Sequence, residues 1–258
     1  MAQIHPSAVV APEAKLASDC CVGAFSVVGP DVVVGSETVI GSHVLIEGIT
    51  EIGERCQIFS HVVLGAAPQI FQDRSEKTRL VIRDETIIRE FASVHRGSVK
   101  GRGVTVLGCR NYIMAYAHIA HDCLLHDDVV VVSQAGLAGH VEVESRAVIG
   151  GQAGIHQFVR IGQYAMVGAC SKVSQDIPPF MMANGNRAKC YGLNTVGLRR
   201  HGISEEAILR LKQAYRLLFV SHLNTSQALE RIASEVTSCP EIDRLMHFIK
   251  LSARGIAR

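Results

Sequence analysis

Aliphatic side chains recur at every sixth position over most of the chain. From Ile4 to Leu64, each sixth residue is Ile, Leu or Val. The spacing returns over 82–94 and, after a shift of one residue, from Leu107 to Val173. An amphipathic helix repeats every three or four residues, so this period does not suit a helix. It suits short strands joined by tight turns, with three hexads forming each coil and coils stacking about 4.8 Å apart.

The hexad pattern therefore predicts a mostly β protein whose residues 1–190 form a parallel β-helix with the aliphatic side chains inside. The period alone does not fix the handedness. Residues 66–81 contain Pro68 and a polar, charged run, and we expect an external loop there, with a regular coil and one polar corner as the alternative. A second loop is expected at 97–103. Loops that leave a rigid scaffold commonly carry binding function.

The C-terminal quarter has a different pattern. Pro178 and Pro179 end the hexads, and helical spacing begins after a turn-rich stretch. Ser204, followed by Glu205 and Glu206, is typical of the start of a helix. We therefore expect a small α-helical domain over 191–258. It carries ten Lys and Arg against six Asp and Glu, which favours an acidic partner or an anionic ligand, with a solvated helical surface as an equal alternative.

Composition and charge exclude several classes of protein. Apolar residues make up 48% and charged residues 19%, which excludes a disordered chain. The net charge of +2 gives no nucleic-acid signature. The start, MAQIHPSAVV, predicts neither a signal peptide nor a membrane span. Eight cysteines without a C-x-x-C pair are typical of reduced thiols, so we expect a cytoplasmic protein.

Candidate chemistry centres on three histidines. His121, His140 and His156 are separated by about one coil each, which predicts that they lie near one another beside a shared groove. Any one of them alone is more often structural. His121 is followed by Asp122, and an imidazole held by a carboxylate is a natural general base for a hydroxyl nucleophile. Gly139 offers an unobstructed N–H for a developing oxyanion.

Motifs for a covalent nucleophile, a phosphate loop or a dinucleotide site are absent from the sequence, which favours direct transfer. We expect no metal site. A zinc site from His118, His121 and His140, as in a hydro-lyase on the same fold, is a weaker alternative. Another alternative is that the protein is a scaffold without enzymatic activity.

Several longer stretches match a known family. They are IREFASVHRGS (88–98), IMAYAHIAHDC (113–123), LAGHV (137–141), IGGQAGIHQFVRIG (149–162), MVGACS (166–171), DIPPF (176–180) and NTVGLRR (194–200). The chain resembles the UDP-N-acetylglucosamine O-acyltransferases that open lipid A biosynthesis. The resemblance implies a left-handed β-helix, a homotrimer with sites between subunits, and no tightly bound cofactor. The acyl donor would be carried on the phosphopantetheine of acyl carrier protein.

The resemblance also implies roles for particular residues. His121 matches the general base, Asp122 the residue that orients it, and Gly139 the donor to the thioester oxyanion. Ala169 matches the position that limits acyl-chain length. The matches to substrate-binding positions are Gln69, His95, His118, His140, His156 and Gln157, with Asn194 and Arg200 near the nucleotide.

Some positions depart from the family pattern. In residues 68–74, the acidic and basic residues usual in the family are missing from their positions. Asp73 and Arg74 could replace them only if the loop were shifted along the sequence. Val196 and His201 stand where an acidic residue and a second Arg are common. The acceptor atom and chain length therefore stay open. The alternatives are N-acylation of a 3-amino UDP-sugar and a divergent transferase that uses coenzyme A or carrier protein.

Overall fold

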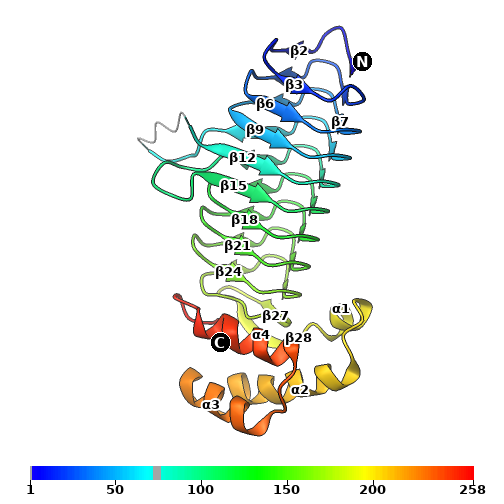
Figure 1. Ribbon diagram of the computed structural model, residues 1–258. Helices are drawn as coiled ribbons and strands as arrows, with labels where there is room; N and C mark the ends of the chain where they lie inside the picture. The colour runs from blue at the N-terminus through cyan, green and yellow to red at the C-terminus, as the bar shows by residue number, and fades with distance from the viewer. Residues whose placement is uncertain (1, 72–76) are drawn as a thin grey trace.

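Short parallel strands stack into a tall three-sided coil, with a small group of helices at its C-terminal end (Figure 1). The computed structural model describes residues 2–71 and 77–258. The coil winds left-handed from the N-terminus towards the helices (Figure 1). The predicted fold class, a left-handed parallel β-helix followed by a small helical domain, is confirmed.

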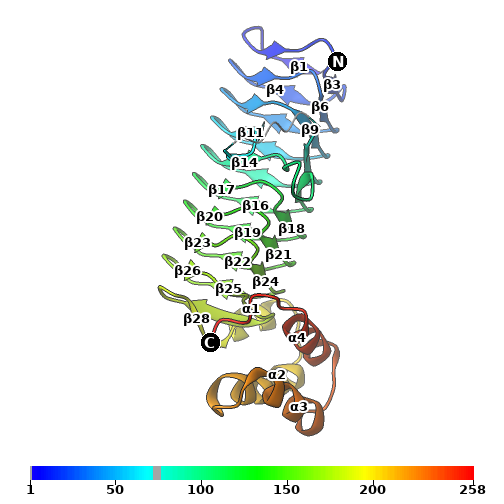
Figure 2. The same cartoon turned by 90° about the vertical axis from the view of Figure 1, so that its left-hand side faces the viewer.

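Three sheets form the sides of the coil, and each takes one strand from every turn (Figure 2). The first sheet contains β1 (Gln3–Ile4), β4 (Cys21–Val22), β7 (Val39–Ile40), β10 (Gln57–Ile58), β13 (Ile87–Ile88), β16 (Tyr112–Ile113), β19 (Val130–Val131), β22 (Val148–Ile149), β25 (Met166–Val167), β27 (Met181–Asn184) and β28 (Lys189–Leu193). The second contains β2 (Val9–Val10), β5 (Val27–Val28), β8 (Leu45–Ile46), β11 (Val63–Ala66), β14 (Ser93–His95), β17 (His118–Ile119), β20 (Gly136–Leu137), β23 (Gly154–Ile155) and β26 (Lys172–Val173). The third contains β3 (Lys15–Leu16), β6 (Val32–Val34), β9 (Ile49–Ile52), β12 (Arg79–Ile82), β15 (Val104–Leu107), β18 (Leu124–Leu125), β21 (Glu142–Val143) and β24 (Arg160–Ile161).

The register confirms the predicted coil length. Ile4 pairs with Val22 and Ile119 with Leu137, so residues that pair between adjacent coils without an insertion lie eighteen residues apart. Because every hexad aliphatic meets its counterpart in the next coil, the interior is a stack of branched side chains. Most of these positions are fully buried, as are Leu64, Ile119 and Ile149. Burial of this apolar surface is the main force that holds the coils together.

Two insertions break the register. Gln57 pairs with Ile87, thirty residues on, and Ile87 pairs with Tyr112, twenty-five residues on. The first insertion lies between β11 and β12, and its residues 72–76 are outside the described part of the chain. The second lies between β14 and β15 and includes 97–103, where the second loop is expected. The first, expected over 66–81, ends earlier than predicted because Arg79 already starts β12 and pairs with Ile49. Leu80 and Ile82 are buried there, so the hexad pattern resumes at Ile82 as expected, whereas the strand starts before it.

The C-terminal domain begins after an antiparallel hairpin of β27 and β28. The boundary expected at 191 falls inside β28, which covers the last coil and extends to Leu193. The helices are α1 (Thr195–Arg200), α2 (Glu205–Tyr215) with a π-helical extension η1 (Arg216–Val220), α3 (Thr225–Glu235) and α4 (Pro240–Lys250). Ser204 caps α2 as predicted, accepting a hydrogen bond from the Ala207 N–H. Over the described ranges, none of the helices has the length and apolar character needed to cross a bilayer.

Candidate active site

A groove of about 530 Å³ lies along the second sheet. Its floor follows one register column, in which His118, Gly136, Gly154 and Lys172 stand at equivalent positions of successive coils. A Cβ atom added at Gly136 or Gly154 would meet nothing within 4 Å, so the two glycines leave the groove open between His118 and Lys172. The remaining lining residues include Gln69, His121, Gly139 and His156.

His121 and Asp122 form a hydrogen-bonded dyad at one end of this groove. Nδ1 of His121 lies 2.8 Å from Oδ2 of Asp122. Since an ionised carboxylate only accepts hydrogen bonds, Nδ1 carries the proton and the neutral ring leaves Nε2 as a base. Asp122 reaches the ring of its own neighbour because its backbone adopts a left-handed corner conformation, with φ of 59°. The sequence left this contact open, and the corner makes it possible within one chain.

The second loop supplies further donors to Asp122. The Ser98 N–H lies 3.1 Å from both carboxylate oxygens, and the Ser98 hydroxyl donates to Oδ2 at 2.5 Å. The Gly103 N–H donates to Oδ1 at 2.9 Å. Burial by itself raises the pKa of Asp122, but the hydrogen bonds from Ser98 and His121 outweigh it and hold this pKa below the usual value. The carboxylate therefore stays ionised although it is fully buried.

Gly139 lies directly against the imidazole of His121. A Cβ atom at position 139 would come within 2.6 Å of His121 Nε2. Only glycine therefore allows the ring to keep its place. In the described part of the chain, no hydrogen-bond acceptor is recorded for the Gly139 N–H, so this donor is available beside the base.

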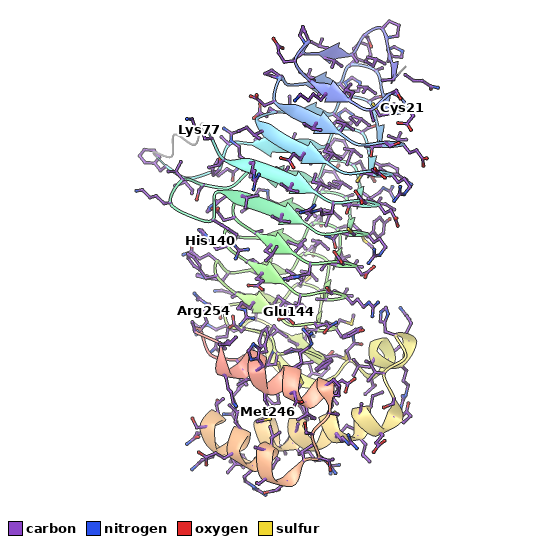
Figure 3. All side chains as sticks on the ribbon, viewed as in Figure 1. Cys21, Lys77, His140, Glu144, Met246 and Arg254 are labelled. Atoms are coloured by element: carbon purple, nitrogen blue, oxygen red, sulfur yellow. The ribbon has the colours of Figure 1, made fainter. Side chains whose placement is uncertain are left out.

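His140 departs from the expected shared groove. It follows Asp122 by one coil in the same corner column and has φ of 64°. Its ring stacks on Phe158 at a centroid distance of 4.4 Å and is not among the side chains that line the groove. His140 Nε2 lies 3.9 Å from Asp122 Oδ2, and its ring meets that of His121 edge-on. Figure 3 places His140 at the edge of the coil from which the first loop, with Lys77, also projects.

Of the three histidines, His121 and His156 line the groove, whereas His140 contacts the dyad beside it. A difference of one residue in register is enough to change the direction of a corner side chain. His156 lines the groove and is exposed, and its Nδ1 lies 3.1 Å from the carbonyl oxygen of Gln157. Gln157 is exposed next to it, outside the groove lining.

His95 and His118 pack edge to face, at a centroid distance of 5.0 Å. Nδ1 of His118 lies 2.8 Å from the Ser93 hydroxyl, whereas Nδ1 of His95 is buried without a hydrogen-bond partner in the described part of the chain. Burial, helped by the neighbouring His118, lowers the pKa of His95 to about 4. Burial also lowers the pKa of His118. Both rings are therefore neutral at physiological pH.

The low pKa of His95 predicts acid-dependent loss of stability. Between pH 6.5 and 4 the unfolded chain binds a proton at this residue that the folded chain does not, so stability falls as the pH falls through that range. We expect the free energy of unfolding of His95→Gln to fall less than that of wild type over this range, by up to about 3 kcal/mol. Denaturant titrations at pH 7 and pH 4.5 measure the difference. Exposed His5→Gln is the control and should follow wild type; equal slopes for all three proteins would contradict the assignment.

Other predicted site residues lie apart from this groove. Asn194 caps α1, accepting from the Gly197 N–H and donating to the Tyr164 carbonyl oxygen. Arg200 is exposed at the end of that helix. Ala169 is exposed on the turn just before Lys172. The structure does not bring these three residues into the groove beside His121.

The residues of the altered first loop are only partly described. Gln69 lines the groove, and Phe71 is almost fully exposed. Gln72, Asp73 and Arg74 lie outside the described residues, as does Glu76. Of the other departures, Val196 is exposed and the ring of His201 packs against Tyr164.

Sequence reasoning missed the residues that hold Asp122. Ser98 and Gly103 belong to the second loop, and the Thr105 hydroxyl accepts the Asp122 N–H at 2.8 Å. The break in the hexad period at 97–103 was the available signal. Lys172, at the far end of the groove, was also missed.

The cluster of His121, Asp122 and His140 resembles a metal site only in its composition. Its ligand atoms lie within 4.8 Å of one another. However, the Asp122 oxygens already accept hydrogen bonds from Ser98, Gly103 and His121, and the second loop covers them. Moreover, His118, part of the zinc alternative, is not in this cluster and is bonded to Ser93. This donor set fits a proton relay better than a metal ion.

The hexapeptide coil, the histidine–aspartate dyad in a groove and the C-terminal helices define the class of protein: a hexapeptide-repeat acyltransferase. A family model described as bacterial transferase hexapeptide (six repeats) matches residues 14–48. A second, described as UDP N-acetylglucosamine O-acyltransferase, domain 2, matches residues 176–257.

Full-length relatives narrow this class to one family. The chain is 48% identical over 257 residues to the acyl-[acyl-carrier-protein]–UDP-N-acetylglucosamine O-acyltransferase of Syntrophobacter fumaroxidans. The match covers 99% of this chain and 100% of that protein. The solved UDP-N-acetylglucosamine O-acyltransferase of Moraxella catarrhalis superposes with a TM-score of 0.94, at 41% identity over 99% of each chain. That of Campylobacter jejuni gives 0.93, at 38% identity over 99% of each chain. The chain belongs to the acyl-[acyl-carrier-protein]–UDP-N-acetylglucosamine O-acyltransferase family.

Proposed function

We propose that the protein transfers a 3-hydroxyacyl chain from acyl carrier protein to the 3-hydroxyl of UDP-N-acetylglucosamine, the first step of lipid A biosynthesis. The observation that carries the proposal is the dyad: Nδ1 of His121 is bonded to Asp122, and Gly139 lies against the other side of the ring. This geometry supports our assignment of His121 as the base and of the Gly139 N–H as the oxyanion donor, since both residues line one groove. The family membership of the full-length chain supplies the substrates.

In the proposed reaction, Nε2 of His121 removes the proton from the acceptor hydroxyl as its oxygen attacks the thioester carbonyl carbon. Asp122 stabilises the imidazolium that forms. The Gly139 N–H donates to the oxyanion of the tetrahedral intermediate. As the intermediate collapses, His121 returns its proton to the departing phosphopantetheine sulfur. The acyl chain thus passes directly to the sugar, and no residue of the protein is acylated.

The substrate contacts are proposals of the same account. Gln69, His118 and His156 line the groove, and we propose that they bind the sugar and the donor. Asn194 and Arg200 would meet the nucleotide across a subunit boundary, since they lie away from the groove of their own chain. Ala169, on the turn before Lys172, would limit the length of the acyl chain.

We also propose a homotrimer with sites between subunits. Large apolar side chains are exposed along the coil, including Val27, Val39 and Phe91. At one corner, rings stack from coil to coil at centroid distances of 4.8–5.1 Å in the order Phe25, His43, His61, Phe91 and Tyr116. A continuous surface of this kind is suited to packing against another copy.

The charge of the helical domain and the free cysteines support the proposed acyl donor and the proposed compartment. Lys212, Arg216 and Arg231 line a depression of about 470 Å³ on the helical domain, which suits an acidic carrier protein. The eight cysteines are all free, which supports a reducing, cytoplasmic setting. We propose no tightly bound cofactor, because the carrier's phosphopantetheine brings the acyl group.

The experiment is an acylation assay with the purified protein. It offers carrier proteins with 3-hydroxyacyl chains of several lengths, and the matching coenzyme A thioesters, to UDP-N-acetylglucosamine and its 3-amino analogue. We expect mass spectrometry to find acylated UDP-N-acetylglucosamine, formed faster from carrier protein than from coenzyme A. Transfer to the 3-amino analogue alone would support the alternative reaction, and no transfer to either acceptor would contradict the proposal.

A further inference from the structure

The second loop covers a corner that is open elsewhere along the coil. Asp122, His140 and Phe158 occupy the same corner position in three successive coils, each with φ near 60°. Side chains at such a position point outward, and Phe158 is 51% exposed. Asp122 is fully buried in the same orientation. The difference is the second loop, which lies over Asp122 and not over Phe158.

The inserted residues bring hydrogen-bond donors rather than apolar cover. Ser98 offers its N–H and its hydroxyl, and Gly103 offers its N–H, all to the Asp122 carboxylate. An ionised carboxylate buried without such donors would be strongly destabilised. Ser98 is itself buried, so its hydroxyl has a fixed position beside Oδ2, the oxygen that also binds Nδ1 of His121.

The middle of the loop is fitted closely to the dyad. A Cβ atom at Gly101 would collide with the Asp122 carboxylate and come within 2.6 Å of His140 Cε1. In contrast, Val99 is 64% exposed at the tip of the loop. The loop thus has one face that contacts the dyad and another that faces away from it.

We propose that the second loop is a positioning element of the acyltransferase, in which the Ser98 hydroxyl holds the Asp122 carboxylate in place for Nδ1 of His121. This inference rests on the proposed function. Ser98 contacts neither substrate nor the reacting atoms in this account. It acts through Asp122, which in turn orients and stabilises the base.

The experiment compares kinetics of three variants. Ser98→Ala removes the hydroxyl but keeps the backbone donor, and we expect kcat to fall about tenfold with KM changed less than twofold, because one hydrogen bond to a charged group is lost. Ser98→Thr keeps a hydroxyl and should recover most of the activity. Val99→Ala, on the outer face of the same loop, should match wild type.

The pH profile separates positioning from a general structural role. The acidic limb of kcat/KM reports protonation of the dyad as a unit. Losing a donor to the carboxylate raises its affinity for protons, so the limb of Ser98→Ala should move to higher pH by roughly half a unit to one unit. A structural role alone would lower the amount of folded enzyme without moving the limb.

The outcomes are distinct. A Ser98→Ala enzyme whose kcat is within twofold of wild type would overturn the inference. So would a loss of activity that matches the loss of folded enzyme, with the acidic limb of the pH profile unchanged. In both cases an active wild-type enzyme leaves the proposed function intact. A folded wild-type protein that transfers no acyl chain would instead contradict the proposed function itself.

Discussion

Replacing His121 by alanine is expected to lower kcat for acyl transfer about a thousandfold, within the range attributed to general bases. Nε2 of His121 is the proposed proton acceptor, and alanine leaves no base at that position. Asp122 cannot substitute, because its oxygens are buried and occupied by Ser98 and Gly103. Initial rates with saturating acyl donor and UDP-N-acetylglucosamine measure the effect.

The matched control is His126→Ala. His126 is an exposed histidine five residues further on, paired with Glu142 on the third sheet, away from the groove. It should retain near-wild-type kcat. Circular dichroism and size-exclusion chromatography should show that both variants keep the wild-type fold and assembly, since neither side chain is part of the aliphatic core. A His121→Ala enzyme with more than a tenth of wild-type kcat would show that another group removes the proton.

Gly139→Ala should have an effect of comparable size, although it removes no functional group. The added methyl would occupy space within 2.6 Å of His121 Nε2, so the ring must leave its position against Asp122 or the corner backbone must shift. Either movement separates the base from the oxyanion donor. We expect kcat to fall more than a hundredfold, as misplaced catalytic groups lose the advantage of orientation.

Gly192→Ala serves as the control for glycine replacement as such. A Cβ atom at position 192, in β28, would meet nothing within 4 Å, so the variant should keep wild-type rates. If Gly139→Ala retained more than a tenth of wild-type kcat with an unchanged fold, close contact between Gly139 and His121 would not matter for catalysis.

The fold was largely predictable because a single six-residue period governs the interior. Each coil repeats the same arrangement of buried side chains, so one aliphatic position in six determines both the buried face and the strand register. The two loops were predictable for the same reason, as breaks in that period. The extent of β28 was not, because the hairpin that closes the last coil follows no repeat.

The site was less predictable than the fold. Spacing placed His121 and His156 beside one groove, but it could not show that His140 stacks on Phe158 and contacts Asp122, since that depends on the left-handed corner at one residue. The dyad was suggested by adjacency in sequence, yet its contact also needs a corner. The donors from Ser98 and Gly103 come from an irregular loop, whose only signal in the sequence is an interruption of the period.

The account depends most on His121 acting on the acceptor hydroxyl itself rather than on a nucleophile of the protein. The direct measurement is intact-protein mass spectrometry after rapid mixing with a 3-hydroxyacyl carrier protein, with and without UDP-N-acetylglucosamine. We expect the protein mass to stay unchanged in both cases, and acylated UDP-N-acetylglucosamine to form only when the sugar is present. A protein heavier by one acyl chain, which then passes that chain to the sugar, would contradict the central claim.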